Sequence, residues 1–446
     1  MIAAQRWNAG AVTAPAGPAA WLRARAWLGV PIVLALWALV PEMRRLIDWK
    51  IGFNSVSLVS VVPLLALVPP AAALVYGGKL RALRPALAWC GWLWLGGFSF
   101  ALAVGLMAGN GAAALYTYAE FVLPMAFGLW VATLDLPWRL LHARVARFLL
   151  ALSTPLCLYA AYQFVKPPVW DVLWMLHANI TAIGVPLPYQ FRPFSTLNSP
   201  GPFADLLVAA IVLNLPRLDG AKPLRLAQVA LCLATLMLTM VRSDWIALVV
   251  AVLCYVVLTP NRARNLALLS VACAACAVLA FNASALLGDA AAGNGLQARL
   301  QTFTDLSSDR SYNERQSYFG DVLTTAFEQP TGTGLGITGT AAKLGSLQRT
   351  LDFDNGYVAR FTEMGYFGTA CYLAVMLGAL GFAAREWSHA ARGRDAPRAA
   401  LAAAVLAFGL ALAFLDISSD HHDALDGVLF WLVLALLARP TVPARR

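Results

Sequence analysis

The sequence predicts an all-α, polytopic membrane protein with about twelve transmembrane helices and one large helical loop outside the membrane. Of its 446 residues, 60% are hydrophobic and only 13% are charged. The mean hydropathy of +0.67 is too high for a water-soluble protein with a single core of this size. The hydrophobic residues also form runs long enough for a helix to cross a bilayer, without the alternation that membrane β-strands show.

These apolar runs follow one another along most of the chain and predict about eleven to thirteen spans. They divide the chain into an N-terminal bundle of about nine spans (1–283), a large outer loop (284–365) and about three C-terminal spans (366–446). Because the loop is too long for a simple connection and is not of low complexity, we expect it to be functional. The expected spans centre on residues 27–41, 55–77, 85–107, 116–134, 148–165, 200–216, 226–241, 245–259, 265–283, 366–384, 399–415 and 424–438.

Basic residues predict the orientation of these spans. Most of the 33 lysines and arginines lie at the two termini and in alternate connections, and positive charge resists translocation, so both termini should be cytoplasmic. Residues 42–54 do not fit this charge pattern, because Arg44, Arg45 and Lys50 fall on the predicted outer side. Either this segment lies flat near lipid headgroups or the first span is misassigned. The net charge of +10 thus reflects topology and the lipid bilayer, and no nucleic-acid partner is expected.

The seven cysteines all fall within predicted spans. Cys273 and Cys276 have a redox or metal-binding spacing, but no polar neighbour is present to activate a thiolate. We therefore expect small buried hydrophobic residues and no disulfides.

Polar residues gather on the predicted outer face. Arg192 and Asn198 precede one span, Arg242 and Asp244 form a turn before another, and Arg315 opens a helix predicted within the large loop. Simple explanations exist, since Arg242 could pair with Asp244 and Arg315 could be a solvated surface residue. However, three guanidinium groups on one face match the oxygens of a phosphate in bidentate geometry. The pattern therefore predicts a diphosphate site at the outer leaflet.

The segment "LDFDNGYVARFTEMGYFG" (351–368) is unusually polar for this chain. Asp352 or Asp354 can cap a helix that stops near Gly365. Alternatively, Asp354 acts as a general base on a sugar hydroxyl. The preceding "PTGTGLG" (330–336) is expected to be a turn, because a phosphate-binding loop would need a strand before it and a lysine after it.

Other charged residues lie where a partner is needed. Glu120 and Asp205 fall inside predicted spans, where an unpaired charge is costly. His421 and His422 share the short outer turn "DISSDHHDALD" with several aspartates. We expect a hydrated turn there; a metal site or a histidine that takes part in a reaction are the alternatives.

Taken in order, four segments resemble the O-antigen ligase and polysaccharide polymerase family of multi-span glycosyltransferases. They show an arginine and an asparagine before a span, a charged turn at the membrane edge, an arginine followed by Pro-x-Gly-x-Gly, and a polar pair leading into Glu-x-Gly-x-x-Gly. The segments are "RPFSTLNSPGPFADLL" (192–207), "VRSDWIAL" (241–248), "RQSYFGDVLTTAFEQPTGTGLG" (315–336) and "DNGYVARFTEMGYFG" (354–368).

This resemblance implies a glycosyltransferase-C-like enzyme that uses neither metal nor cofactor. It would transfer a glycan from undecaprenyl diphosphate to a hydroxyl group at the periplasmic side of the bacterial inner membrane. Arg242 and Arg315 would stabilise the departing diphosphate, and Asp354 would be the base. We assign substrate binding to Arg192, Asn198, Arg310, Asn355 and Glu363.

The acceptor is the open question. Lipid A-core ligases of this family usually have a histidine before the asparagine that corresponds to Asn355, whereas this chain has Asp354. The difference favours a polymerase, whose acceptor is another lipid-linked repeat unit and whose partners include a chain-length regulator. A ligase acting on lipid A-core is the alternative. A flippase or transporter is less favoured, since no internal repeat is evident.

Overall fold

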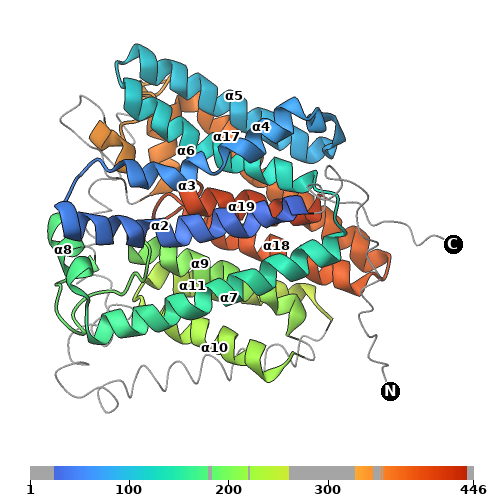
Figure 1. Ribbon diagram of the computed structural model, residues 1–446. Coiled ribbons are helices and arrows are strands. Elements are labelled where there is room, and N and C mark those ends of the chain that lie inside the picture. The colour runs from blue at the N-terminus through green and yellow to red at the C-terminus, as the bar shows by residue number, and fades with distance from the viewer. Residues whose placement is uncertain are drawn as a thin grey trace.

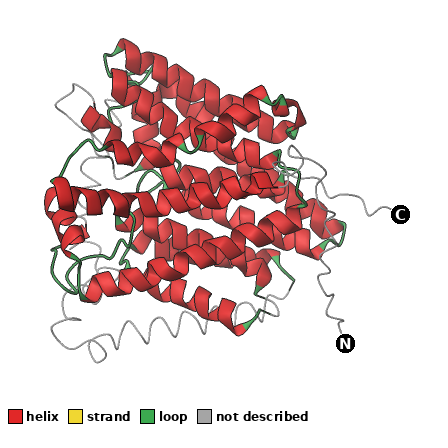
Figure 2. Cartoon of the chain, in the orientation of Figure 1, coloured by secondary structure: helices red, strands yellow, loops and turns green. Residues whose placement is uncertain are grey.

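The computed structural model describes residues 25–178, 183–218, 221–260, 327–344, 353 and 355–438. Within these ranges all regular secondary structure is helical, as Figure 2 shows. The predicted all-α class is therefore confirmed for the described part of the chain. The expected span at 265–283 and most of the large loop lie outside these residues.

The described helices match most of the predicted spans. Seven of them are long and apolar enough to cross a membrane, which confirms a polytopic membrane protein, and α10 and α19 are shorter apolar helices. One of the seven is Leu58–Tyr76, at the second expected span, where the short helices α3 and α4 follow each other. The helices are α2 (Gly29–Ile51), α3 (Val62–Leu65), α4 (Val68–Tyr76), α5 (Pro85–Met107), α6 (Gly111–Ala132), α7 (Trp138–Val165), α8 (Val169–Ala178), α9 (Pro200–Asn214), α10 (Pro223–Leu238), α11 (Arg242–Leu258), α17 (Gly356–Arg392), α18 (Ala396–Leu415) and α19 (Ala424–Leu437).

Helix α9 lies inside the bundle, among α7, α10, α11, α18 and α19 (Figure 1). From Phe203 to Asn214 every residue is buried, as expected for a helix that is apolar on all sides. On the outside of the bundle, large apolar side chains such as Trp89, Trp92 and Leu377 are exposed. In a membrane protein these side chains face lipid, so their exposure has no hydrophobic cost.

The two ends of the bundle differ in their charges. At one end, which we call the basic end, Arg398 contacts Glu386 at 2.9 Å and Arg139 contacts Asp395 at 3.4 Å. At the opposite end, the site end, the turn between α5 and α6 meets residues 330–338, and the start of α17 meets the turn between α18 and α19. Loops predicted to be cytoplasmic thus meet at the basic end, and the described site candidates lie at the site end.

The structure corrects both interpretations of residues 42–54. Helix α2 continues through Arg44 and Arg45 to Ile51, and both arginines are buried. The Arg45 guanidinium lies 3.0 Å from the Asp171 carboxylate and donates to the carbonyls of Leu197 and Ser195 at 2.7 Å each. These basic residues are therefore partners of a buried network at the site end, which explains why they do not follow the charge rule for loops.

Candidate functional site

Residues 330–336 and residues 360–368, which both contain glycines, fold against each other at the site end. We call them the interlocked segments. Thr333 N–H donates to the Thr362 carbonyl at 2.8 Å, and Gly334 N–H donates to the Glu363 carbonyl at 3.0 Å. In return, Tyr366 N–H donates to the Pro330 carbonyl at 3.0 Å. Since these N–H groups are used within the protein, "PTGTGLG" is the turn that the sequence predicts.

The glycines allow the backbones to approach this closely. Gly365 has φ +59° and interrupts α17, as the sequence predicts, and a Cβ there would lie 2.3 Å from the Pro330 carbonyl oxygen. Gly334 has φ +84°, and a Cβ there would lie 2.2 Å from the backbone nitrogen of Gly105 on α5. A side chain is excluded at both positions by conformation and by space.

Arg360 of α17 links its own helix to the α18–α19 turn and to residues 330–338. Its guanidinium, which is 2% exposed, contacts Glu363 and Asp420 at 2.8 Å each. Glu363 in turn accepts hydrogen bonds from the Thr338 hydroxyl at 2.8 Å and the Thr338 N–H at 3.2 Å. The Phe121 ring of α6 lies under the guanidinium at 4.6 Å. Arg360 thus fixes α17 to the α18–α19 turn and to residues 330–338.

Three polar side chains of the α18–α19 turn, Asp416, His421 and His422, are buried, so the expected hydrated turn is wrong for them, whereas Ile417 and Ser419 are exposed. Asp416 and His422 are fully buried and His421 is 5% exposed. The Tyr372 hydroxyl of α17 donates to Asp416 at 2.6 Å, and His422 Nδ1 lies 3.0 Å from the same carboxylate. The Gly356 N–H donates to the Asp416 carbonyl at 2.7 Å. Helix packing has therefore removed these three side chains from water and given them protein partners.

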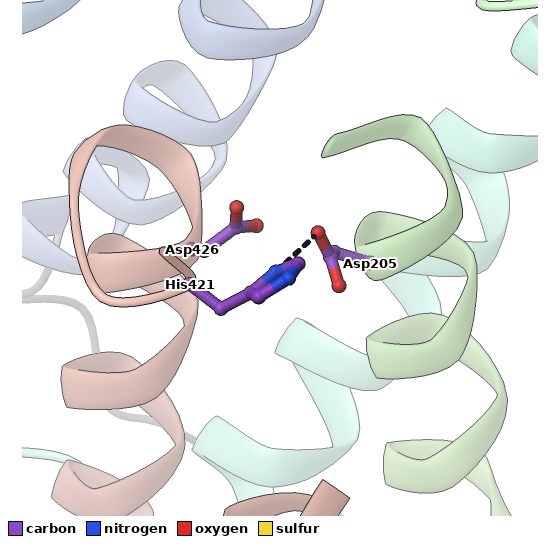
Figure 3. Close-up of side chains that lie close together, drawn as sticks. All are labelled: Asp205, His421 and Asp426. Carbon is purple, nitrogen blue, oxygen red and sulfur yellow. Dashed lines mark hydrogen bonds and ion pairs between the residues drawn. The ribbon is translucent and has the colours of Figure 1, made fainter. Parts of the chain in front are cut away.

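A second polar group in the same region brings together α9, α11 and α19. His421 Nδ1 lies 3.1 Å from Asp205 Oδ2, and the Asp426 carboxylate lies beside the His421 ring (Figure 3). One ligand-type atom from each of these three residues lies within 4.8 Å of the others. Asp244 lies beside Asp205 within hydrogen-bonding reach.

The charges of the turn respond to these neighbours. Burial alone would lower the pKa of His421, but the Asp205 carboxylate raises that pKa well above its usual value. Burial alone would raise the pKa of Asp416, but His422 lowers that pKa below its usual value. Burial and the nearby Asp420 raise the pKa of Asp423 to about 7. The turn thus contains charge pairs whose protonation depends on their partners.

The predicted site residues that the structure describes all lie at the site end. Arg192 is half-buried in the loop before α9, and Arg242 is the half-buried first residue of α11. Asn198 is exposed, and its carbonyl accepts from the Trp174 indole at 3.3 Å. Asn355 caps α17, because its side chain accepts from the Val358 N–H at 3.1 Å. Glu363 is the buried partner of Arg360 described above.

The start of α17 and the surroundings of Arg360 differ from the sequence prediction. The N-cap of α17 is Asn355, and not Asp352 or Asp354 as expected. The network around Arg360 was not predicted, although the spacing from Arg360 to Glu363 places both on one helix face and could have indicated it. Asp354, Arg310 and Arg315 lie outside the described residues.

Comparison with known families now bears on this site. Residues 227–373 match the family model described as O-antigen ligase. This match, which covers about a third of the chain, supports the resemblance to the O-antigen ligase and polymerase family. The matched residues contain Arg242, the interlocked segments at 330–336 and 360–368, and the ion pair between Arg360 and Glu363. A search of the curated proteins finds no match to the chain.

The match to the O-antigen ligase model supports a glycosyltransferase-like activity of the ligase or polymerase type and suggests lipid-linked glycans as substrates. The matched residues end within α17, so Asp416, His421 and Asp426 lie beyond them. The buried polar side chains between α18 and α19 therefore add a second polar region next to the matched segments.

Proposed function

We propose that this protein is a polysaccharide polymerase of the O-antigen ligase and polymerase family. It transfers an undecaprenyl-diphosphate-linked glycan onto a hydroxyl group of another lipid-linked repeat unit. The observation that carries this proposal is the place of Arg242, which begins α11 within the family match and at the site end. In this proposal the protein lies in the bacterial inner membrane, with the site end toward the periplasm and both termini in the cytoplasm.

The proposed reaction is a displacement at the anomeric carbon of the donor glycan. The acceptor hydroxyl oxygen forms a bond to that carbon, the bond from the carbon to the phosphate oxygen breaks, and undecaprenyl diphosphate leaves with the electron pair. Asp354 takes the proton of the acceptor hydroxyl. Arg242 and Arg315 stabilise the negative charge that develops on the leaving diphosphate, so the step needs no metal and no cofactor.

The other assigned residues position the two substrates. Arg192 lies at the same end of the bundle as Arg242, and a permanently charged guanidinium suits a diphosphate. Asn198 offers an exposed amide to sugar hydroxyls. Arg310 is proposed to help bind the donor glycan. Asn355 and Glu363 support the acceptor region by fixing the start of α17.

A ligase that transfers the glycan to lipid A-core is the second candidate. The description of the matched family as O-antigen ligase favours it. Against it stands Asp354, which occupies the place where lipid A-core ligases usually have a histidine. A lipid-glycan flippase is the third candidate, and neither the family match nor the site-end arginines favour it.

Glycan analysis of a strain that lacks the protein distinguishes these candidates. If the protein is a polymerase, the strain should carry single repeat units on the final acceptor and no long chains. Bare lipid A-core together with free undecaprenyl-linked polymer would instead identify a ligase. Single repeat units retained on the cytoplasmic side of undecaprenyl diphosphate would identify a flippase and overturn the proposed function.

The base is tested by Asp354→Asn. We expect the rate of glycan transfer to fall by about 10²–10⁴-fold, because an amide cannot accept the proton. The helix should be unaffected, since Asn355 provides the cap. Asp352→Asn is the matched control and should retain activity. Long glycan chains at the normal level in the Asp354 variant would remove this residue from the reaction.

A further inference from the structure

Four buried ionisable side chains at the site end have no role in the proposed transfer. Asp205 of α9, Asp244 of α11, His421 of the α18–α19 turn and Asp426 of α19 are each 5% exposed or less. They come from separate parts of the chain and meet where α9, α11 and α19 approach one another. We call these four residues the acidic cluster.

The charges in the acidic cluster do not balance. It contains three carboxyl groups, and the ion pair between His421 and Asp205 is the one that its members form within the described part of the chain. Even a protonated His421 would offset only one negative charge. An uncompensated carboxylate in the interior costs several kcal/mol of folding free energy. Some further positive species is needed to make the arrangement stable.

The unused lone pairs of the acidic cluster indicate what that species is. Asp205 Oδ1, Asp244 Oδ1, Asp426 Oδ1 and His421 Nε2 are all buried and have no hydrogen-bond partner among the described residues. Asp426, which is 4% exposed, has its carboxylate beside the His421 ring and toward Asp205 (Figure 3). A shared proton can join Asp205 to Asp244, which lies beside it, whereas a cation can bind Asp205, His421 and Asp426 together.

We propose that the acidic cluster binds a divalent transition-metal cation through Asp205, His421 and Asp426, with Asp244 as a nearby carboxylate. One ligand-type atom from each of the three residues already lies within 4.8 Å of the others. A set of one imidazole nitrogen and carboxylate oxygens suits Zn²⁺ or Mn²⁺, whereas Mg²⁺ and Ca²⁺ prefer oxygen ligands alone.

The cation would hold elements together and would take no part in glycan transfer. Asp205 anchors the start of α9, and His421 and Asp426 belong to the turn and helix that also carry Asp416 and Asp420. Fixing that turn also fixes the partners of Tyr372 and Arg360 on α17. The proposal is independent of the proposed function, because its test measures metal binding and not activity.

The test uses the full-length protein in lipid nanodiscs, stripped with a chelator and dialysed against dilute Zn²⁺. We expect about one tightly bound Zn²⁺ per chain by elemental analysis. His421→Gln and Asp426→Asn should each retain less than about a tenth of that amount. His142→Gln is the matched control, since His142 is also buried but contacts the Leu213 carbonyl at the basic end. It should bind Zn²⁺ as the unaltered protein does.

A second measurement uses the unaltered protein, so its result does not depend on whether the variants fold. With Mn²⁺ as the probe, electron spin echo spectra of the unaltered protein should show coupling to a histidine nitrogen that changes on ¹⁵N-histidine labelling. Absence of stoichiometric Zn²⁺ after dialysis would overturn the proposal and leave protons as the counter-charge. Full Zn²⁺ binding by His421→Gln, or Mn²⁺ without nitrogen coupling, would place the cation elsewhere and overturn it as well.

Discussion

Replacing Arg242 by alanine should abolish long-chain glycan while leaving the amount of protein in the membrane unchanged. The side chain begins α11 at the site end and is half-buried. In the proposed reaction it faces the diphosphate on which negative charge develops, and loss of one such fixed donor costs about 10²–10³-fold in rate. Transfer from a synthetic undecaprenyl-diphosphate donor by purified protein is the direct measurement, and Arg315→Ala should show a loss of the same order.

Two further variants give this experiment its controls. Arg242→Lys keeps the charge but loses the bidentate geometry, so its rate should lie between those of the unaltered protein and Arg242→Ala. Arg139→Ala removes an arginine at the basic end, where the side chain is 49% exposed and contacts Asp395. Its glycan should be normal. A normal chain-length distribution in Arg242→Ala would exclude the role assigned to this residue.

Replacing Gly334 by alanine should prevent folding of the site end. The added Cβ would lie 2.2 Å from the Gly105 nitrogen and 2.3 Å from its Cα, and both atoms belong to the backbone of α5. The residue also has φ +84°, which L-amino acids rarely adopt. We expect a loss of about 4 kcal/mol or more in unfolding free energy, which is comparable to the entire stability of many domains.

Gly339 provides the comparison for this substitution. It also has a positive φ, of +65°, but a Cβ there would meet nothing within 4 Å. Gly339→Ala should therefore cost only the conformational penalty of about 1–2 kcal/mol. Thermal unfolding and gel filtration of the two variants in detergent separate the two contributions. Equal stability of the two variants would show that the contact between residue 334 and α5 is not tight.

Much of the fold follows from the sequence because crossing a bilayer imposes local requirements. Each span must satisfy its own backbone hydrogen bonds and present apolar side chains, so hydropathy locates most helices. The turn at "PTGTGLG" and the interruption near Gly365 were also predictable, since glycine marks positive φ. Hydropathy also located the second span, but not its division into the short helices α3 and α4, which lie beside its prolines.

The site was predictable only in part. Arg192 and Arg242 are proposed for it because a charge at the membrane edge is costly unless it is used, and both lie at the site end. Asp205 raised the same question, but its partner His421 lies 216 residues away in the sequence. The α18–α19 turn differs from its prediction for a related reason: its composition is that of a hydrated loop, and helices elsewhere in the chain bury its residues Asp416, His421 and His422.

The sequence by itself determined the membrane class, the positions of most helices and the family motifs, because each of these depends on residues that are close together in the chain. Tertiary structure alone decided that Arg45 pairs with Asp171, that Arg360 joins Glu363 to Asp420, and that the acidic cluster forms. The physical reason is that the free energy of a buried charge depends on which distant groups surround it, and only packing of the helices brings those groups together.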